Sequence, residues 1–311
     1  FVEIMALEDP LEDNNEIKSN IIRDGICFRK AVMDKFSKLK WKCSPEYPYS
    51  LQEFTTDRNI SKSADIFASR RFGRPDFVDL NFIIECKKSY APKSKWLFFK
   101  INENKIRAWN FHFPCETVLL DCMGNLTNKA VDVCYDQTVL KPAKKNSKTG
   151  EKLQQANLHT SGTQIYQASA EVAHALYGIK NEKDKQYSEV DNEIWRDVFS
   201  FFKNRWFVPI VITNAELNVS EFEITEDTLL KGTIKNKDFK LKPVPWLIFE
   251  YPLPNYLQLP EDDKDSSFPF NFDNYIRKLP IIYLNSSKIE DFLQLIYQST
   301  APYLYSTGRI K

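Results

Sequence analysis

Apolar residues recur at near-helical spacing over residues 16–39, and this pattern predicts the first long helix. Spacings of three or four residues place such side chains on one helical face, which can then pack on a core. Asn14 and Asn15 come just before the segment, and both are suitable N-cap residues. The apolar positions are Ile17, Ile21, Ile22, Cys27, Phe28, Val32 and Phe36.

Three later segments also predict helices. Residues 161–177 are rich in alanine and periodic, and residues 188–204 carry apolar side chains along one helical face. A last helix is expected to begin at about Lys288, because Ser287 and Glu290 form a capping-box pattern there.

Shorter apolar runs predict strands. Residues 207–213 form a continuous apolar run typical of a buried strand, whereas residues 216–224 alternate like a half-exposed strand. Polar residues 55–62 suit a hairpin connection, and residues 70–75, which include Gly73, suit a turn. The expected strands span residues 41–50, 64–69, 76–88, 96–100, 117–121, 207–213, 216–224, 245–251 and 279–284.

Strands and helices mixed in this order indicate an α/β or α+β fold. The chain has 311 residues, of which 42% are hydrophobic, so it is long enough to bury a sizeable core. We expect a single domain over residues 1–311. Its parts are a core motif region at 16–100, a peripheral loop and helices at about 101–205, and later strands with the C-terminal helix at 206–311. Within the second part, residues 141–152 carry five lysines and predict an exposed loop.

Composition and charge narrow the function classes. The net charge is only +1, so a nucleic-acid partner would need a local basic surface. No apolar stretch of about 18 residues occurs, and the first residues carry acids, so we expect a cytoplasmic protein with no membrane partner. The six cysteines form no C-x-x-C pair and are expected to be reduced core residues.

Several common catalytic patterns are missing from the sequence. His112, His159 and His174 share no metal-ligand spacing. Walker A, G-x-S-x-G and Rossmann glycine patterns do not occur, and the chain has only 8 glycines. These observations exclude the usual nucleotide hydrolases and serine hydrolases.

The most informative short motif is Glu85-Cys86-Lys87, which ends the apolar run Phe82-Ile83-Ile84. Side chains two apart in a strand point to the same face, so the Glu85 carboxylate and the Lys87 ammonium would stand side by side. Acid-x-Lys triplets are expected about four times by chance in a chain of this composition, and five occur. Only this triplet ends a strand-like run.

This region resembles the PD-(D/E)XK nuclease superfamily, which has the restriction-endonuclease-like fold. The resemblance is carried by Ser-Ala-Asp-Ile-Phe-Ala at 63–68 and Phe-Ile-Ile-Glu-Cys-Lys-Lys-Ser at 82–89, and it extends to Trp-Leu-Phe-Phe at 96–99. Family members place an Asp on one strand of a hairpin and an acid-x-Lys on the next. The resemblance implies an α/β fold with a restriction-endonuclease-like core, in which a central mixed β-sheet is flanked by helices and carries peripheral additions.

The resemblance also implies a function. Family members are metal-dependent nucleases, so we expect an endonuclease of restriction, defence or repair type that hydrolyses DNA phosphodiester bonds. Asp65 and Glu85 would bind Mg²⁺ or Mn²⁺, and Lys87 would orient the attacking water. A homodimer is expected, because double-strand cutting by this fold usually uses two active sites. Two alternatives stay open: a catalytically silent nucleic-acid- or nucleotide-binding protein of the same fold, and an interaction subunit of a larger complex.

Three residues are candidates for the second acid that would bind the metal together with Glu85: Asp65, Asp76 and Asp79. Asp76 follows a proline, as in the literal family motif, but on a continuous strand it would lie about 30 Å from Glu85 at about 3.3 Å per residue. A tight turn near Leu80-Asn81 would bring it closer, yet that segment lacks the Gly or Pro that such turns favour. Asp65 is therefore the favoured metal ligand, with Asp76 and Asp79 as alternatives.

Two further site residues of the family match this sequence less closely. A third acid in this family often comes from the first helix or the next strand, where Glu16, Glu46 and Glu53 are candidates. Glu46 is preferred, because it lies just past the apolar start of the strand expected at 41–50. Gln164, at the start of the alanine-rich helix, stands where family members often carry a supporting Gln or Lys.

A basic stretch begins at the lysine of the motif. Residues 87–107 contain seven bases and one acid, with aromatic residues interleaved. Such a run next to a metal site predicts a rim that contacts phosphates. The expected nucleic-acid-binding residues are Lys88, Lys93, Lys95 and Lys100.

Overall fold

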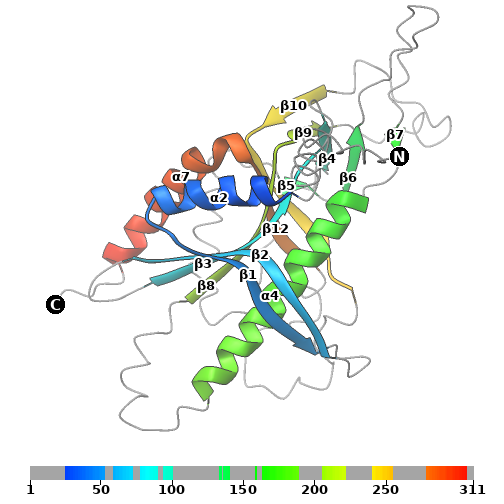
Figure 1. Cartoon of the computed structure of the whole chain (residues 1–311). Helices are drawn as coiled ribbons and strands as arrows, with labels where there is room; N and C mark the ends of the chain where they lie inside the picture. Colours follow the sequence, from blue (N-terminus) through cyan, green and yellow to red (C-terminus); the bar gives the residue numbers. More distant parts are fainter. Residues whose placement is uncertain are drawn as a thin grey trace, which may run out of the picture.

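The computed structural model shows a mixed β-sheet with helices on both faces, together with a second sheet (Figure 1). The chain is therefore an α/β protein, as the mixed order of predicted helices and strands indicated. The structure describes residues 25–52, 59–72, 78–89, 94–100, 133–134, 136–140, 158–159, 163–188, 205–221, 240–254 and 278–306.

The first sheet has seven strands, which in spatial order are β1 (Lys42–Gln52), β2 (Asn59–Phe72), β3 (Val78–Lys87), β8 (Arg205–Thr213), β12 (Lys278–Asn285), β11 (Trp246–Pro252) and β5 (Val133–Cys134). β1, β2 and β3 form an antiparallel meander. β8 then joins β3 in parallel, and β12 joins β8 in parallel. A parallel pair requires a crossover connection, and the longest described helix lies between β3 and β8 in the chain.

The second sheet has the order β10 (Lys240–Val244), β9 (Glu216–Glu221), β4 (Lys95–Lys100), β6 (Asp136–Leu140) and β7 (Leu158–His159). β9 is an inner strand between β10 and β4. Its consecutive residues Leu217, Asn218, Val219 and Ser220 are all buried. The prediction of a half-exposed strand here is wrong, because this strand is covered on both faces.

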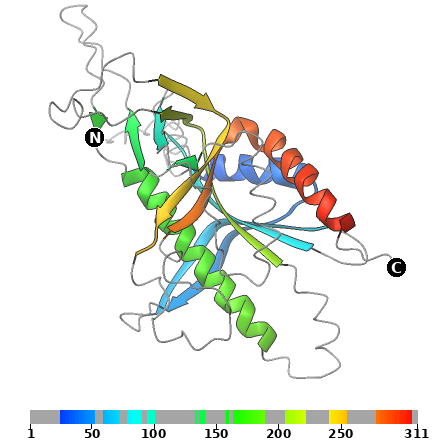
Figure 2. The ribbon, with the colours of Figure 1, turned by 180° about the vertical axis from the view of Figure 1, so that it is seen from behind.

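The helices lie on opposite faces of the first sheet. α2 (Ile26–Lys38) and α7 (Ile289–Ser306) lie side by side on one face, and α4 (Thr163–Ser188) crosses the other, as Figures 1 and 2 show from two sides. A short 3₁₀ turn, η4 (Ser286–Lys288), leads into α7. None of the helices in the described part of the chain is both long and apolar enough to cross a membrane.

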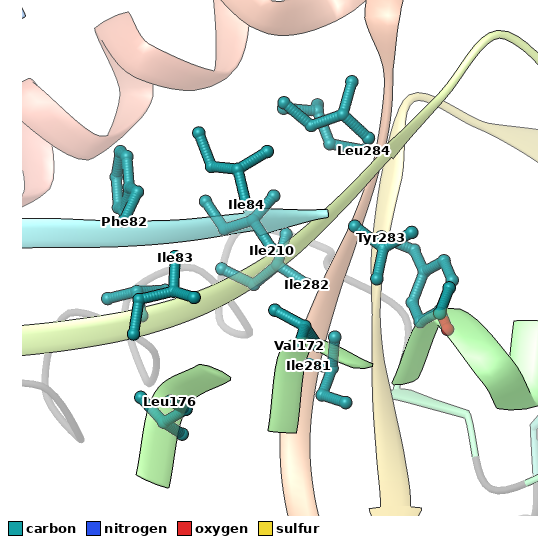
Figure 3. Close-up of a cluster of buried hydrophobic side chains, with 14 of the residues drawn as sticks. Phe82, Ile83, Ile84, Val172, Leu176, Ile210, Ile281, Ile282, Tyr283 and Leu284 are labelled. Carbon is teal, nitrogen blue, oxygen red and sulfur yellow. The ribbon is translucent and has the colours of Figure 1, made fainter. Parts of the chain in front are cut away.

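Side chains of β3 point alternately to the two faces of the first sheet and contribute to the core on both. Phe82 and Ile84 point away from Leu176 of α4, whereas Ile83 points toward it (Figure 3). All three β3 side chains are fully buried. Burial of one such side chain stabilises the fold by about 1.5–3 kcal/mol. Because both faces of β3 are covered, its end is a rigid support for Glu85 and Lys87.

Several predicted elements are confirmed over their described parts. They are the helix in 16–39, the helix at 161–177, which continues to Ser188, and the strands at 41–50, 76–88, 96–100, 207–213, 245–251 and 279–284. The predictions for Asn14, Asn15, residues 117–121, residues 141–152 and the helix at 188–204 beyond its first residue fall outside the described residues.

Other predictions are corrected. β2 is longer than the strand expected at 64–69, so residues 59–62 and 70–72 belong to it and not to a connection or a turn. The side chain that caps the C-terminal helical segment belongs to Asn285, whose Oδ1 accepts from the Ser287 amide at 2.9 Å, instead of to Ser287. Cys27 is exposed and not a core residue, although Cys43 and Cys86 are half-buried free thiols as expected.

Candidate functional site

Asp65 and Glu85 are neighbours on adjacent antiparallel strands. Ile66 of β2 pairs with Ile84 of β3, which aligns Asp65 with Glu85 at the next position of the register. Cross-strand partners share one face of a sheet, so the two carboxylates lie side by side. The Glu85 side chain is only 12% exposed and that of Asp65 24% exposed. The structure thus brings together the two acids that the sequence analysis favoured.

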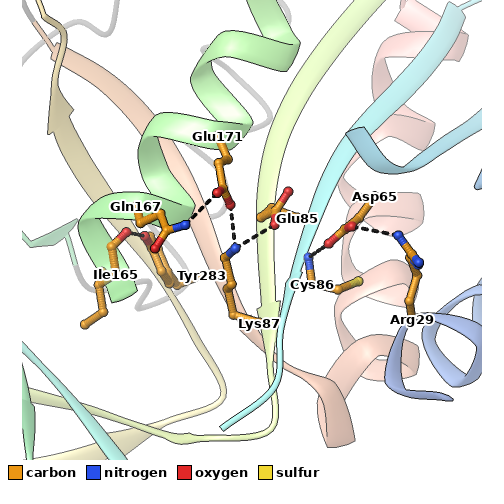
Figure 4. Close-up of polar contacts among 9 residues, drawn as sticks. All are labelled: Arg29, Asp65, Glu85, Cys86, Lys87, Ile165, Gln167, Glu171 and Tyr283. Carbon is orange, nitrogen blue, oxygen red and sulfur yellow. Dashed lines mark hydrogen bonds and ion pairs between the residues drawn. The ribbon is translucent and has the colours of Figure 1, made fainter. Parts of the chain in front are cut away.

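Asp65 is held in place at both carboxylate oxygens. Its Oδ2 accepts a hydrogen bond from the backbone N–H of Cys86 at 2.8 Å, and its Oδ1 accepts from Nη1 of Arg29 at 3.0 Å (Figure 4). The first contact comes from β3 and the second from the first turn of α2. Hydrogen bonds to ionised groups are strong, so Asp65 has a defined orientation.

Lys87 is bound by two acids. Its Nζ lies 2.9 Å from Oε1 of Glu85 and also donates to Oε2 of Glu171 on α4. Gln167, one turn before Glu171 on the same helix, donates from Nε2 to Oε1 of Glu171 at 2.8 Å. Figure 4 shows these side chains as a continuous row of polar contacts from α4 to the strand.

The protonation of the site follows from burial and from these contacts. Burial, and then the charges of Asp65 and Glu171, raise the pKa of Glu85 well above its ordinary value, against the opposing effect of Lys87. Burial would also raise the pKa of Glu171, but hydrogen bonds from its neighbours, first of all Lys87, outweigh burial and lower it. Glu85 is one of those neighbours, so Glu85 holds a proton more readily than an ordinary carboxyl group and Glu171 less readily.

Lys87 is a cation at neutral pH. Burial alone would lower the pKa of Lys87, but the charge of Glu85 and the hydrogen bond to Glu171 more than compensate, and the pKa is raised above its ordinary value. A charged ammonium can donate hydrogen bonds and stabilise anions, but it cannot accept a proton. Lys87 is therefore suited to orient a water or to stabilise negative charge.

Glu46 joins the site from β1 through Arg29. The β1–β2 register pairs Pro45 with Ile66 and Tyr47 with Ala64, which sets Glu46 opposite Asp65. Glu46 has a φ of 46° and a side chain that is 66% exposed, and its Oε1 lies 3.0 Å from Nη2 of Arg29. A left-handed conformation in a residue with a side chain costs about 1–2 kcal/mol, and such strain is common at functional sites.

Asp79 is not a partner of Glu85. It lies six residues before Glu85 on the same strand, a separation of about 20 Å at about 3.3 Å per residue. Both of its oxygens accept from Arg71, at 2.7 and 2.9 Å. β3 also runs through Leu80 and Asn81 without a turn. Of the two alternative acids, Asp79 is therefore corrected to a paired residue at the far end of β3, and Asp76 lies outside the described residues.

Other predicted site residues are scattered. Gln164 is exposed in the first turn of α4, and the helix residue that reaches Lys87 is Glu171, two turns further on. Lys95 lies 3.4 Å from Glu216 in an exposed pair, and Lys88 is half-buried. The remaining predictions, Glu16, Glu53, Lys93 and the side chain of Lys100, fall outside what the structure describes.

Arg29, Gln167 and Glu171 are site residues that the sequence pattern did not predict. Arg29 lies 36 residues before Asp65, and Glu171 lies 84 residues after Lys87. Both stand on segments that the periodicity correctly predicts as helices. Their only local signal is polar side chains on otherwise packed helices, and such residues are common on solvated faces.

The charges of the site are unbalanced. Four carboxylates meet two bases, so the cluster carries a net charge of −2 when all six groups are ionised. The members are Glu46, Asp65, Glu85, Glu171, Arg29 and Lys87. A divalent cation would cancel this charge, and carboxylate oxygens are ligands that Mg²⁺ and Mn²⁺ prefer.

The donor set limits how an ion could be held. In the part of the chain that the structure describes, no group of three or more His, Cys, Asp or Glu side chains is arranged to hold a metal ion. Mg²⁺ is usually held by one or two carboxylates with waters and substrate phosphates. Asp65 and Glu85 could supply those two carboxylates.

Comparisons of the chain with protein-family models, with curated proteins and with solved structures gave no match.

Proposed function

We propose that this protein is a metal-dependent nuclease that hydrolyses DNA phosphodiester bonds, with a restriction-endonuclease-like core. The observation that carries the proposal is the cross-strand pair of Asp65 and Glu85 with Lys87 two residues beyond Glu85. The arrangement of the sheet supports it, because the three residues lie on neighbouring strands of a mixed sheet with helices on both faces. Endonuclease action, of restriction, defence or repair type, belongs to the same proposal.

The metal belongs to the proposal as well. Asp65 and Glu85 would hold Mg²⁺ or Mn²⁺, since they are adjacent, partly shielded from water and part of a cluster with excess negative charge. When bound, such an ion would lower the pKa of an attacking water and offset the charge that develops on the phosphate.

The side chains of the protein supply positioning and charge. Lys87 remains a cation because of Glu85 and Glu171, so it donates to the water or to a phosphate oxygen and does not act as a base. Glu171 and Gln167 fix the direction of the ammonium from α4. The Cys86 amide fixes Asp65. The contacts of Glu171 with Lys87 and of the Cys86 amide with Asp65 each join two secondary-structure elements, which keeps the site rigid.

A catalytically silent protein that binds nucleic acid through the same fold is the second candidate. It is favoured by the lack of a three-ligand metal group among the described residues. The placement of Asp65 beside Glu85 and Lys87 argues against it, because two largely buried neighbouring carboxyl groups have no evident structural benefit.

Plasmid cleavage separates the two candidates. Supercoiled DNA is incubated with the full chain and Mg²⁺ or Mn²⁺, and an RNA of the same sequence tests the choice of nucleic acid. Wild type should nick or cut the plasmid, whereas Asp65→Asn and Lys87→Ala should lose at least about a hundredfold in rate. Asp79→Asn is the matched control, and it should keep wild-type activity.

Binding without cleavage under every metal condition would favour the silent protein, and absence of both would refute the proposal. Mass measurement in solution, with and without DNA, tests the predicted homodimer.

A further inference from the structure

Arg29 and Lys87 flank the two acids from opposite sides. In Figure 4 the row of side chains runs from Gln167 and Glu171 through Lys87 and Glu85 to Asp65, and Arg29 closes it. Glu171 of α4 contacts Lys87 on one face of the sheet, and Arg29 extends from the first turn of α2 on the other face. A substrate phosphate held between the acids would thus have a base on each side.

The guanidinium of Arg29 has more hydrogen-bond donors than its two acidic neighbours occupy. Arginine carries five N–H groups in a planar fork. One on Nη1 contacts Oδ1 of Asp65, and one on Nη2 contacts Oε1 of Glu46, each at 3.0 Å. No other hydrogen bond or ion pair of the group is made with the described residues, which therefore occupy two of its five N–H donors. The side chain is 21% exposed, so it can be reached from solvent while its neighbours fix its direction.

The charge balance explains why a phosphate would bind there. Without a cation, the carboxylates that contact Arg29 compensate its charge. A divalent cation at Asp65 and Glu85 would bring the six-residue cluster to neutrality, and Arg29 would then no longer be surrounded by excess negative charge. Planar guanidinium groups bind phosphate oxygens in a bidentate manner, which a lysine ammonium cannot do.

We propose that Arg29 is the phosphate-binding residue of this site, donating to the non-bridging oxygens of a DNA phosphate next to the two acids. The proposal rests on the proposed nuclease function and adds the group that recognises the substrate backbone. The competing explanation is that Arg29 only ties α2 to β1 and β2 through Asp65 and Glu46. The two explanations differ in how DNA binding responds to salt.

The experiment measures binding of a short fluorescent DNA duplex by anisotropy over a range of salt concentrations. The full chain is used with Ca²⁺, which takes oxygen ligands as Mg²⁺ does, and a gel confirms that the duplex stays intact. The variants are Arg29→Ala and Arg29→Lys. Arg71→Ala is the matched control, because it also removes an arginine from an Asp pair, that of Asp79 at the far end of β3.

For Arg29→Ala we expect about tenfold weaker binding at low salt. The slope of log K against log salt should fall by about 0.9, the value of one phosphate contact on duplex DNA. Arg29→Lys keeps the charge, so it should keep the slope and lose only part of the affinity. Arg71→Ala should leave both quantities unchanged.

Wild-type affinity and slope in Arg29→Ala would overturn the proposal and leave Arg29 as a structural tie, while the nuclease function would stand if wild type cuts plasmid. If Arg29→Ala does not fold, a wild-type slope in Arg29→Gln overturns the proposal in the same way. A wild-type protein that neither binds nor cuts DNA would instead refute the proposed function itself.

Discussion

Replacing Glu85 by glutamine should make the protein more stable and inactive at once. The ionised form of Glu85 is disfavoured by burial and by the charges of Asp65 and Glu171, and Lys87 compensates only in part. Glutamine has nearly the same volume, its carbonyl oxygen can accept from Lys87, and its amide can donate to Glu171. The substitution therefore removes a buried charge without leaving a cavity or an unpaired neighbour.

The size of the gain follows from the exposure of the side chain. At 12% exposure, solvent screens the charge poorly. When the folded pKa of a carboxyl lies above its unfolded value, each unit of that difference costs about 1.4 kcal/mol of stability at a pH above both values, and the neutral glutamine avoids this cost. Since Lys87 loses one of its two acidic partners, we expect about 1–2 kcal/mol. Each kcal/mol raises the unfolding midpoint by about 1.5 °C in a chain of 311 residues, because the unfolding entropy is about 2.1 cal/mol/K per residue.

The raised pKa of Glu85 also predicts how the stability difference between wild type and Glu85→Gln changes with pH. Because the folded pKa of Glu85 lies above its unfolded value, the folded state binds more protons between the two values, and wild-type stability falls as pH rises through that window. Below the unfolded pKa, Glu85 is protonated in both states and should behave like glutamine. The advantage of Glu85→Gln should therefore be near zero at acidic pH and largest at pH 8.

Thermal unfolding of wild type and Glu85→Gln in metal-free buffer, from pH 4 to pH 8, tests this reasoning. Glu216→Gln is the control, since it removes an exposed carboxylate that pairs with Lys95, and it should change stability by less than about 1 kcal/mol at any pH. Destabilisation by Glu85→Gln at pH 8, or a gain that does not vary with pH, would refute the reasoning. Activity should be lost in plasmid cleavage.

Two further predictions concern α4. Glu171→Gln should slow cleavage about 10–100-fold, the usual effect of losing a residue that orients a metal-site group, and cleavage assays check this. It should also cost about 1 kcal/mol of folding free energy at pH 7. Because the pKa of Glu171 is lowered in the folded state, this cost should vanish as the pH falls through that pKa, which melting curves check. Gly178→Ala should cost about 3 kcal/mol in chemical denaturation, because its Cβ would overlap with the Tyr49 ring and lie 3.1 Å from the Ser50 carbonyl oxygen. Gly25→Ala meets no atom within 4 Å but has a φ of 74°, so it should cost only about 1 kcal/mol, and equal costs would contradict the packing argument.

The sequence by itself determined the elements whose pattern is local. The apolar run before Glu85 predicts β3, and the alanine-rich period predicts α4, because strand and helix repeats depend on residues only a few positions apart. The Glu85-Lys87 pair could be recognised for the same reason. Asp65 could be preferred over Asp76 only through a limit on distance along a strand.

Tertiary structure decided what depends on contacts between distant segments. The burial of both faces of β9 follows from its place between β10 and β4, which no alternation within residues 216–224 reveals. Arg29 and Glu171 reach the site from helices on opposite faces of the sheet. Which residues they contact depends on how the helices pack against the sheet. The free energy of a charged pair depends on its burial, which only the assembled fold creates. The sequence alone thus specified the acids and the lysine on the strands, whereas the folded chain specified the residues that hold them.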